Sequence, residues 1–169
     1  MTTTTTPAEP KTDVDCTKVQ GRRTLCFKTL DEAYADAELL VAAQNVRMLG
    51  NHSLGQLLSH IGIAINSSID GFSGPAPWII RMLARTIKGR ILKKGMRPGF
   101  RLPGGRERAA FPTAVSASEG LATFKAAIAR CQKEPMTAAH PAFGKLTHEQ
   151  WYRMHCHHAA LHLSFCVPE

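Results

Sequence analysis

Three capping boxes are the features that most constrain what this chain can fold into. In each, a serine or threonine is followed three positions later by glutamine or glutamate, and an apolar stripe with helical spacing begins: Ser53 with Gln56, Ser116 with Glu119, and Thr147 with Gln150. The two side chains of such a box satisfy backbone N–H groups at the start of a helix. They therefore predict three helix starts. A fourth periodic run begins at Asp31 and ends before Gly50.

The spacing of these segments predicts an all-α four-helix bundle. The expected helices run near residues 31–49, 53–70, 116–133 and 147–165, with no substantial sheet. The connection between helices 2 and 3 is long and rich in proline, and it contains an amphipathic piece from Trp78 to about Leu92. A bundle with one long crossover between helices 2 and 3 explains this pattern better than a simple up-and-down bundle.

The remaining sequence favours one domain with a tail. Residues 1–21 are rich in threonine, proline and charge, so we expect a disordered tail before a domain at 22–169. No run of about 18 apolar residues predicts a membrane span, and the N-terminus lacks the apolar stretch of a signal peptide. The five cysteines form no CxxC pair, which favours reduced thiols. We therefore expect a cytoplasmic protein.

Four of the eight histidines lie in a stretch of eight residues inside the last predicted helix. His158 and His162 are about 40° apart around the helix axis, so their imidazoles stack on one face and can share a metal ion. That face also carries apolar residues and points inward. His157 is expected to face the rim or solvent. His155 lies near the inward face, where a ligand, a second-shell partner of the metal or a buried polar residue are all consistent with its position.

A third ligand must come from another helix, and His60 is the one histidine inside the second helix. A lone histidine there is more often a hydrogen-bonded core residue, and the inward HxxxH pair changes that balance. Two buried neutral imidazoles need partners for four nitrogens, and a metal supplies two of them. We favour a site of three histidines over a metal-free polar core or pocket. His52, His140 and His148 are expected to face solvent.

These histidines and several local motifs resemble the DinB-like superfamily of metal-binding four-helix bundles. The sequence looks closest to an uncharacterised bacterial branch of unknown function, over roughly residues 22–168. The matching stretches run from Arg22 through the first helix and then include "LGNHSLGQLLSHI", "SIDGF", "KKGMRPGFRLP", "HPAFGKLTHEQW" and "HHAALHLSF". The resemblance places the metal ligands at His60, His158 and His162. One departure is His52, where we expect tryptophan.

The resemblance implies a divalent metal, zinc or nickel. Several DinB-like proteins resemble thiol-dependent transferases or isomerases, whereas the matched branch has no activity to carry over. From the open site we expect a metal- and thiol-dependent transferase or hydrolase. Three histidines leave coordination positions open, as in catalytic sites, and a low-molecular-weight thiol is the favoured ligand. No Asp or Glu near the histidines offers a general base, and Gln56 is at most a pocket-lining or second-shell residue. A non-catalytic bundle that binds a metal or small ligand is the alternative, and the sequence does not separate the two.

The net charge of +8 comes from one segment, because ten Lys or Arg residues and one Glu lie between Arg81 and Arg108. This segment is either a solvated loop or an anion-binding rim, with Arg97 and Arg101 as candidates, that steers an anionic thiol to the bundle. Nucleic-acid binding is disfavoured because no interleaved aromatics or known motif accompany the charge. The apolar cluster from Trp78 to Leu83 is expected to pack across the bundle or form a homodimer interface, with a membrane surface as the alternative.

Overall fold

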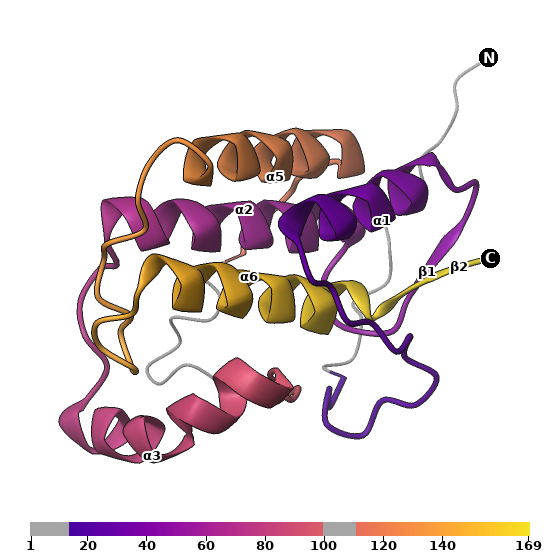
Figure 1. Ribbon diagram of the computed structural model, residues 1–169. Coiled ribbons are helices and arrows are strands. Elements are labelled where there is room, and N and C mark those ends of the chain that lie inside the picture. The colour runs from indigo at the N-terminus through magenta and orange to yellow at the C-terminus, as the bar shows by residue number, and fades with distance from the viewer. Residues whose placement is uncertain (1–13, 100–110) are drawn as a thin grey trace.

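The computed structural model describes residues 14–99 and 111–169, and the regular secondary structure of this part is almost entirely helical (Figure 1). Its elements, in chain order, are α1 (Leu30–Ala42), β1 (Val46–Met48), α2 (Leu54–Asp70), α3 (Trp78–Lys94), α5 (Ala117–Cys131), α6 (His148–Leu163) and β2 (Cys166–Pro168). The helices α1, α2, α5 and α6 pack together as the bundle, and α3 lies in the crossover between α2 and α5. The all-α class and the long crossover are confirmed.

All three predicted capping boxes are formed. At the start of α2, the Ser53 hydroxyl accepts from the Gln56 N–H at 3.3 Å, and the Gln56 side chain accepts from the Ser53 N–H at 2.9 Å. The start of α1 has a simpler cap, in which the Thr29 hydroxyl accepts from the Glu32 N–H at 3.1 Å. Local side-chain chemistry therefore determines where the bundle helices begin.

The predicted end of the first helix is wrong by about seven residues, and that of the last helix differs by about two. The first helix stops at Ala42 rather than near 49, and the last stops at Leu163 rather than near 165. The reason is a small antiparallel ladder between β1 and β2, in which Met48 lies opposite Cys166. A long-range partner thus satisfies backbone groups that would otherwise continue a helix.

Helices α2 and α5 lie side by side and approach unusually closely (Figure 1). A Cβ added to Gly120 would lie 2.4 Å from the Gly55 carbonyl oxygen, and one added to Gly62 would lie 2.9 Å from the Thr123 carbonyl oxygen. Because glycine has no side chain, the two backbones meet directly at these positions, and no larger residue would fit there. This contact determines how closely α2 and α5 approach each other.

The core lies between α1, α2, α5 and α6 and contains the large buried side chains of Trp151, Phe124, Leu58, Ile61 and Leu163. Helix α3 lies at the edge of the core, contributes Leu92 to it and packs on α6, where the Leu92 carbonyl meets His157. Of the two uses expected for the Trp78 to Leu83 cluster, packing across the bundle is wrong, because most of its apolar side chains are exposed, whereas the homodimer interface stays a prediction. Among the described residues, no helix is long and apolar enough to cross a bilayer.

Candidate metal centre

His60 on α2 and His158 and His162 on α6 converge on one point. The Nε2 atom of His158 lies 3.1 Å from Nε2 of His60 and 2.9 Å from Nε2 of His162. One ligand nitrogen from each of the three residues lies within 4.8 Å of the other two. The structure thus brings together the three histidines that the sequence analysis selected as ligands, and we call them the histidine triad.

The helices position this triad through their buried stripes. His158 and His162 lie one turn apart on α6, and their rings meet edge to face with centroids 4.5 Å apart. His60 lies on α2 next to the fully buried Ile61, and its ring meets both of the others edge to face at 4.8–4.9 Å. Burial of the α2 and α6 stripes therefore holds three imidazoles from two helices in a fixed orientation.

The arrangement suits a metal better than it suits hydrogen bonds among the rings. A neutral imidazole nitrogen offers either one proton or one lone pair, so His158 Nε2 cannot make two good hydrogen bonds at once. Nitrogens at metal bond lengths of about 2.0–2.1 Å lie roughly 2.8–3.0 Å apart in octahedral geometry and roughly 3.3–3.4 Å apart in tetrahedral geometry. The two separations from His158 Nε2, 3.1 and 2.9 Å, are within this range, and all three pairs are within 4.8 Å.

The electrostatics also favour neutral rings that can act as ligands. Burial, followed by neighbouring histidines, holds the pKa of His158 and of His162 well below the usual value. Both rings are therefore unprotonated at neutral pH, which is the form that coordinates a metal. No carboxylate or thiol among the described residues belongs to the cluster.

A phenylalanine that the sequence analysis missed covers one side of the triad. The ring of Phe111 stacks on His60 with centroids 4.0 Å apart and on His52 at 3.7 Å, so it lies between two imidazoles. It also meets the His162 ring edge to face at 5.9 Å. His52 is partly buried in this stack, so its predicted solvent-facing position is wrong. Only the return of the crossover to the bundle brings Phe111 here.

Gln56 contacts the residues that follow Phe111 rather than an imidazole of the triad. Its side-chain amide donates to the Pro112 carbonyl at 2.8 Å and to the Thr113 carbonyl at 3.4 Å. The same side chain closes the capping box of α2. Gln56 therefore ties the start of α2 to the residues that follow Phe111.

The other histidines of α6 have partners outside the triad. His155 is buried, its Nε2 lies 3.1 Å from the Ser68 hydroxyl, and its ring stacks on Trp151. Its contacts are thus those of a buried polar residue, one of the three possibilities left open by its position. His157 lies on the other side of α6, where its Nε2 meets the Leu92 carbonyl at 3.3 Å. It faces α3, away from the triad.

His140 is partly buried, so its predicted solvent-facing position is wrong, whereas His148 is exposed as expected. The His140 ring stacks on Phe143 with centroids 4.5 Å apart and lies 5.5 Å from the Trp151 ring. Its Nδ1 accepts from the Ala142 and Phe143 N–H groups. Burial, with a smaller effect of Lys88, lowers its pKa to about 4.

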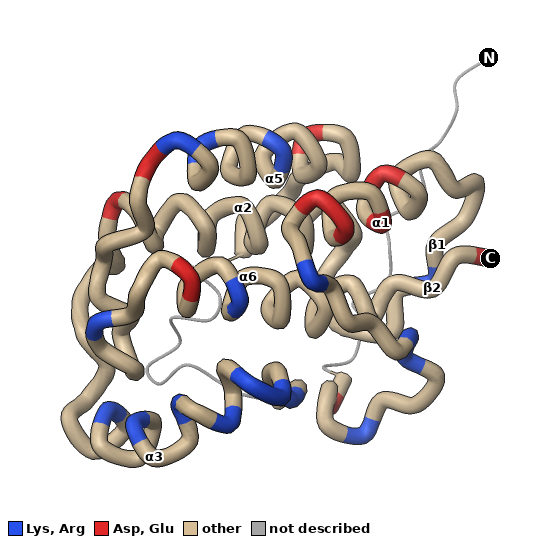
Figure 2. Tube along the Cα trace, in the orientation of Figure 1, with Lys and Arg blue, Asp and Glu red and all other residues tan. Residues whose placement is uncertain are grey.

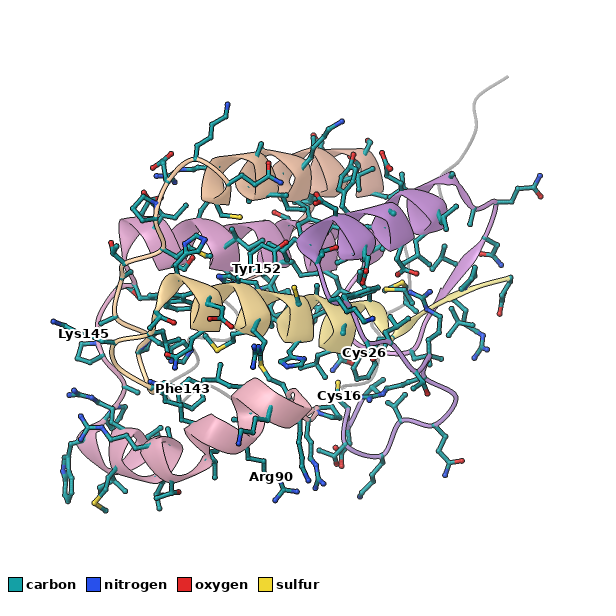
Figure 3. The ribbon with its side chains drawn as sticks, viewed as in Figure 1. Cys16, Cys26, Arg90, Phe143, Lys145 and Tyr152 are labelled. Atoms are coloured by element: carbon teal, nitrogen blue, oxygen red, sulfur yellow. The ribbon has the colours of Figure 1, made fainter. Side chains whose placement is uncertain are left out.

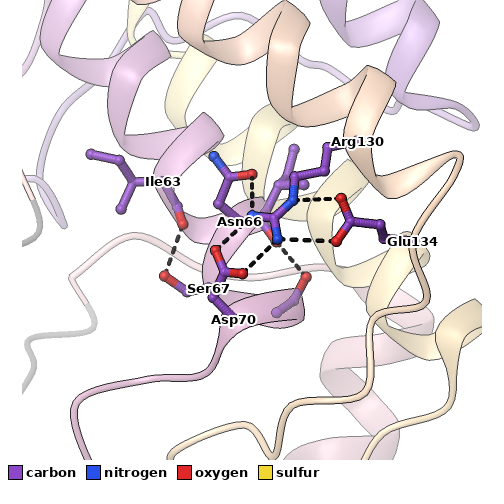
Figure 4. Close-up of polar contacts among 8 residues, drawn as sticks. Ile63, Asn66, Ser67, Asp70, Arg130 and Glu134 are labelled. Atoms are coloured by element: carbon purple, nitrogen blue, oxygen red, sulfur yellow. Dashed lines mark hydrogen bonds and ion pairs between the residues drawn. The ribbon is translucent and has the colours of Figure 1, made fainter.

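The acidic group at the end of α2 pairs with a cation and does not belong to the triad. Asp70, at the end of α2, forms a bidentate ion pair with Arg130 at 2.5 and 2.6 Å, and Arg130 also binds Glu134 (Figure 4). This network joins the end of α2 to α5. Arg97 is exposed just beyond α3. Arg101 lies outside the described residues, as do residues 1–13 of the predicted tail.

The cysteines divide into two groups. Cys16 and Cys26 lie in the lead-in to α1 (Figure 3), whereas Cys131, Cys156 and Cys166 are buried. Burial raises the pKa of Cys156 to about 11 and that of Cys166 to about 12. Both thiols are protonated at neutral pH, so these two cysteines flanking the histidines are packing residues rather than nucleophiles.

Comparison with known families gives one match. A family model described as "Protein of unknown function (DUF1569)" matches residues 19–169. Searches of curated proteins and of solved structures give no match. The comparison therefore covers the whole bundle and attaches no reaction to it.

Proposed function

The chain belongs to the DUF1569 family, and from its histidine triad we propose that it is a divalent-metal protein of the DinB-like kind. The observation that carries the proposal is the convergence of three Nε2 atoms from two helices. The all-α bundle and its long crossover, which the DinB-like resemblance implies, support it.

The donor set narrows the choice of metal. Three neutral imidazoles suit zinc, nickel or another borderline divalent ion rather than magnesium or calcium, which prefer oxygen ligands. Three protein ligands also leave coordination positions open for a small molecule. We propose zinc or nickel as the resident metal.

The surroundings of the triad favour a thiol as the molecule that occupies the open position. A divalent metal held there would lower the pKa of a bound thiol or water. A free thiol already has a pKa near 8.5, so it loses its proton far more readily than water. Water activation for hydrolysis commonly employs a carboxylate base, and no described carboxylate belongs to the cluster. A thiol-dependent transferase therefore fits this site better than a hydrolase.

A non-catalytic metal-binding bundle is the second candidate, and Phe111 is the observation that favours it. Its ring lies flat on His60 and edge-on to His162, which covers one side of the triad with an apolar surface. If the opposite side is also closed to ligands, the bundle holds a metal without reacting.

Metal analysis of the purified, tag-free protein tests the proposal. We expect about one zinc or nickel per chain. His158→Ala should abolish tight binding because it removes the central ligand, whereas His157→Ala, one position away, should retain it because His157 contacts α3. His155→Ala should reduce binding only slightly. Equal loss in His157→Ala and His158→Ala would overturn the metal assignment.

Cobalt substitution then separates the two candidates. Co²⁺ in the triad should give visible absorption bands, and a small thiol such as cysteine should add a sulfur-to-cobalt charge-transfer band if it binds the metal. Phe111→Ala should give this band at a lower thiol concentration. Visible bands that no thiol alters, in either the wild type or Phe111→Ala, would favour the non-catalytic bundle.

A further inference from the structure

Helix α3 presents an apolar surface that no described residue covers. Its N-terminal turns carry five large apolar side chains that are 44–69% exposed: Trp78, Ile79, Met82, Leu83 and Ile87. Scattered single exposed apolar residues are ordinary, but a contiguous group is typical of a binding surface. We call these five residues the α3 apolar stripe.

The stripe shares its side of the helix with three cations. At 100° per residue, the five apolar residues fall within one half of the circumference of α3. Arg90, Lys93 and Lys94, further along the helix, fall within the same half. The opposite half carries Ala84 and Leu92, which are both buried, and the Leu92 carbonyl meets His157 on α6. The outward side of α3 is thus apolar at its beginning and cationic at its end.

The charged residues of α3 are all positive. Between Trp78 and Lys94 there are six Lys or Arg residues and no acid. Figure 2 shows the blue Lys and Arg positions distributed along α3, and Figure 3 shows the Arg90 side chain extending away from α6. A partner for this surface must therefore combine an apolar phase with negative charge.

We propose that α3 docks on the surface of an anionic lipid membrane. The apolar stripe enters the boundary between headgroups and acyl chains, where tryptophan is favoured, and the long stems of Lys93 and Lys94 let their ammonium groups reach the headgroups. The inward half of α3 remains on the bundle through the Leu92 carbonyl, which meets His157 on α6, and through Lys88, which donates to the Lys145 carbonyl in the segment before α6. The bundle therefore stays folded while it is bound.

A second copy of the chain fits this surface less well. The exposed area of the stripe is on the order of 500 Å², below the roughly 800 Å² that each partner buries in a stable specific complex. Pairing two α3 helices would also bring two sets of six positive charges together without an acid from either helix. An anionic membrane satisfies both the charge and the limited area.

Vesicle binding of the full-length protein tests the proposal. We expect the wild type to float with vesicles of phosphatidylglycerol and phosphatidylcholine, not with phosphatidylcholine alone, and to dissociate at high salt. Met82→Glu/Leu83→Glu and Lys93→Glu/Lys94→Glu should each weaken binding by about tenfold or more. Leu39→Glu is the matched control, because Leu39 is 72% exposed on α1 and should leave binding unchanged.

Two further measurements keep the outcome independent of folding and of the metal. Helical circular dichroism and metal content should match the wild type in all three variants, because none of the substituted residues contacts the triad. Trp78 emission should shift to the blue on binding, since the other tryptophan, Trp151, is already buried. Absence of vesicle binding, or equal binding by Leu39→Glu and Met82→Glu/Leu83→Glu, would overturn the proposal. A dimer that Met82→Glu/Leu83→Glu dissociates would assign the stripe to a second copy instead.

Discussion

His140 should make the stability of this protein depend steeply on pH between about 6.5 and 4. Its Nδ1 accepts hydrogen bonds from two backbone N–H groups, of Ala142 at 3.1 Å and Phe143 at 3.0 Å. A proton on Nδ1 would face those two donors and break both bonds. Together with burial, this opposes protonation and agrees with the pKa of about 4 in the folded state.

The sign of the effect follows from the proton balance. In the unfolded chain, His140 has an ordinary pKa of about 6.5, so between pH 6.5 and 4 the unfolded state binds more protons than the folded state. The free energy of unfolding therefore falls as the pH falls through this window. With pKa values of about 6.5 and 4, the loss between pH 7.5 and pH 5 is about 2 kcal/mol.

Urea denaturation at pH 7.5 and at pH 5, with and without His140→Asn, measures this contribution. The asparagine side chain can accept from the same backbone groups but does not titrate. The other histidines are present in both proteins, so their contribution cancels in the difference. We expect the variant to lose about 2 kcal/mol less than the wild type between the two pH values. Equal losses would refute the assignment of a depressed pKa to His140.

Three further predictions concern packing, an ion pair and access to the triad. Gly120→Ala should lower the free energy of unfolding by about 3 kcal/mol, because the added Cβ would meet the backbone of α2. Gly89→Ala has open space around it and should raise the free energy of unfolding by about 0.5–1 kcal/mol. Urea titration at pH 7.5 measures both changes. Arg23→Ala should cost about 2 kcal/mol in the same assay, since it leaves the partly buried Asp36 without its bidentate partner, and an unchanged midpoint would contradict this. Phe111→Ala should retain the metal but release it faster to a chelator, followed by stopped-flow absorbance, because the ring no longer covers the triad.

The sequence pattern predicted the helix α3 but not which of its sides faces the bundle. Its apolar residues predicted an amphipathic piece from Trp78 to about Leu92, and the helix is there. The pattern did not reveal which side faces the bundle, because both halves of α3 carry apolar and basic residues. Only the tertiary structure, which buries Ala84 and Leu92 on one half of α3, decides that Trp78 and Met82 face outward.

The amino-acid sequence by itself determined the helix starts and the relation between His158 and His162. Both depend on residues three or four positions apart, and the hydrogen-bonded geometry of one helix turn places such residues on the same side. The early end of α1 was not predictable in this way, because β1 pairs with a strand more than 100 residues away.

The completion of the triad was decided by tertiary structure. His60 was a candidate because it lies on the buried stripe of α2, yet its distance to α6 depends on how closely the bundle helices approach one another. That approach depends on contacts such as the one between Gly55 and Gly120, which are separated by the whole crossover. Phe111 reaches His60 only when that crossover closes. Local periodicity determines a direction around one helix axis, whereas the distance between helices depends on side-chain volumes brought together from the entire chain.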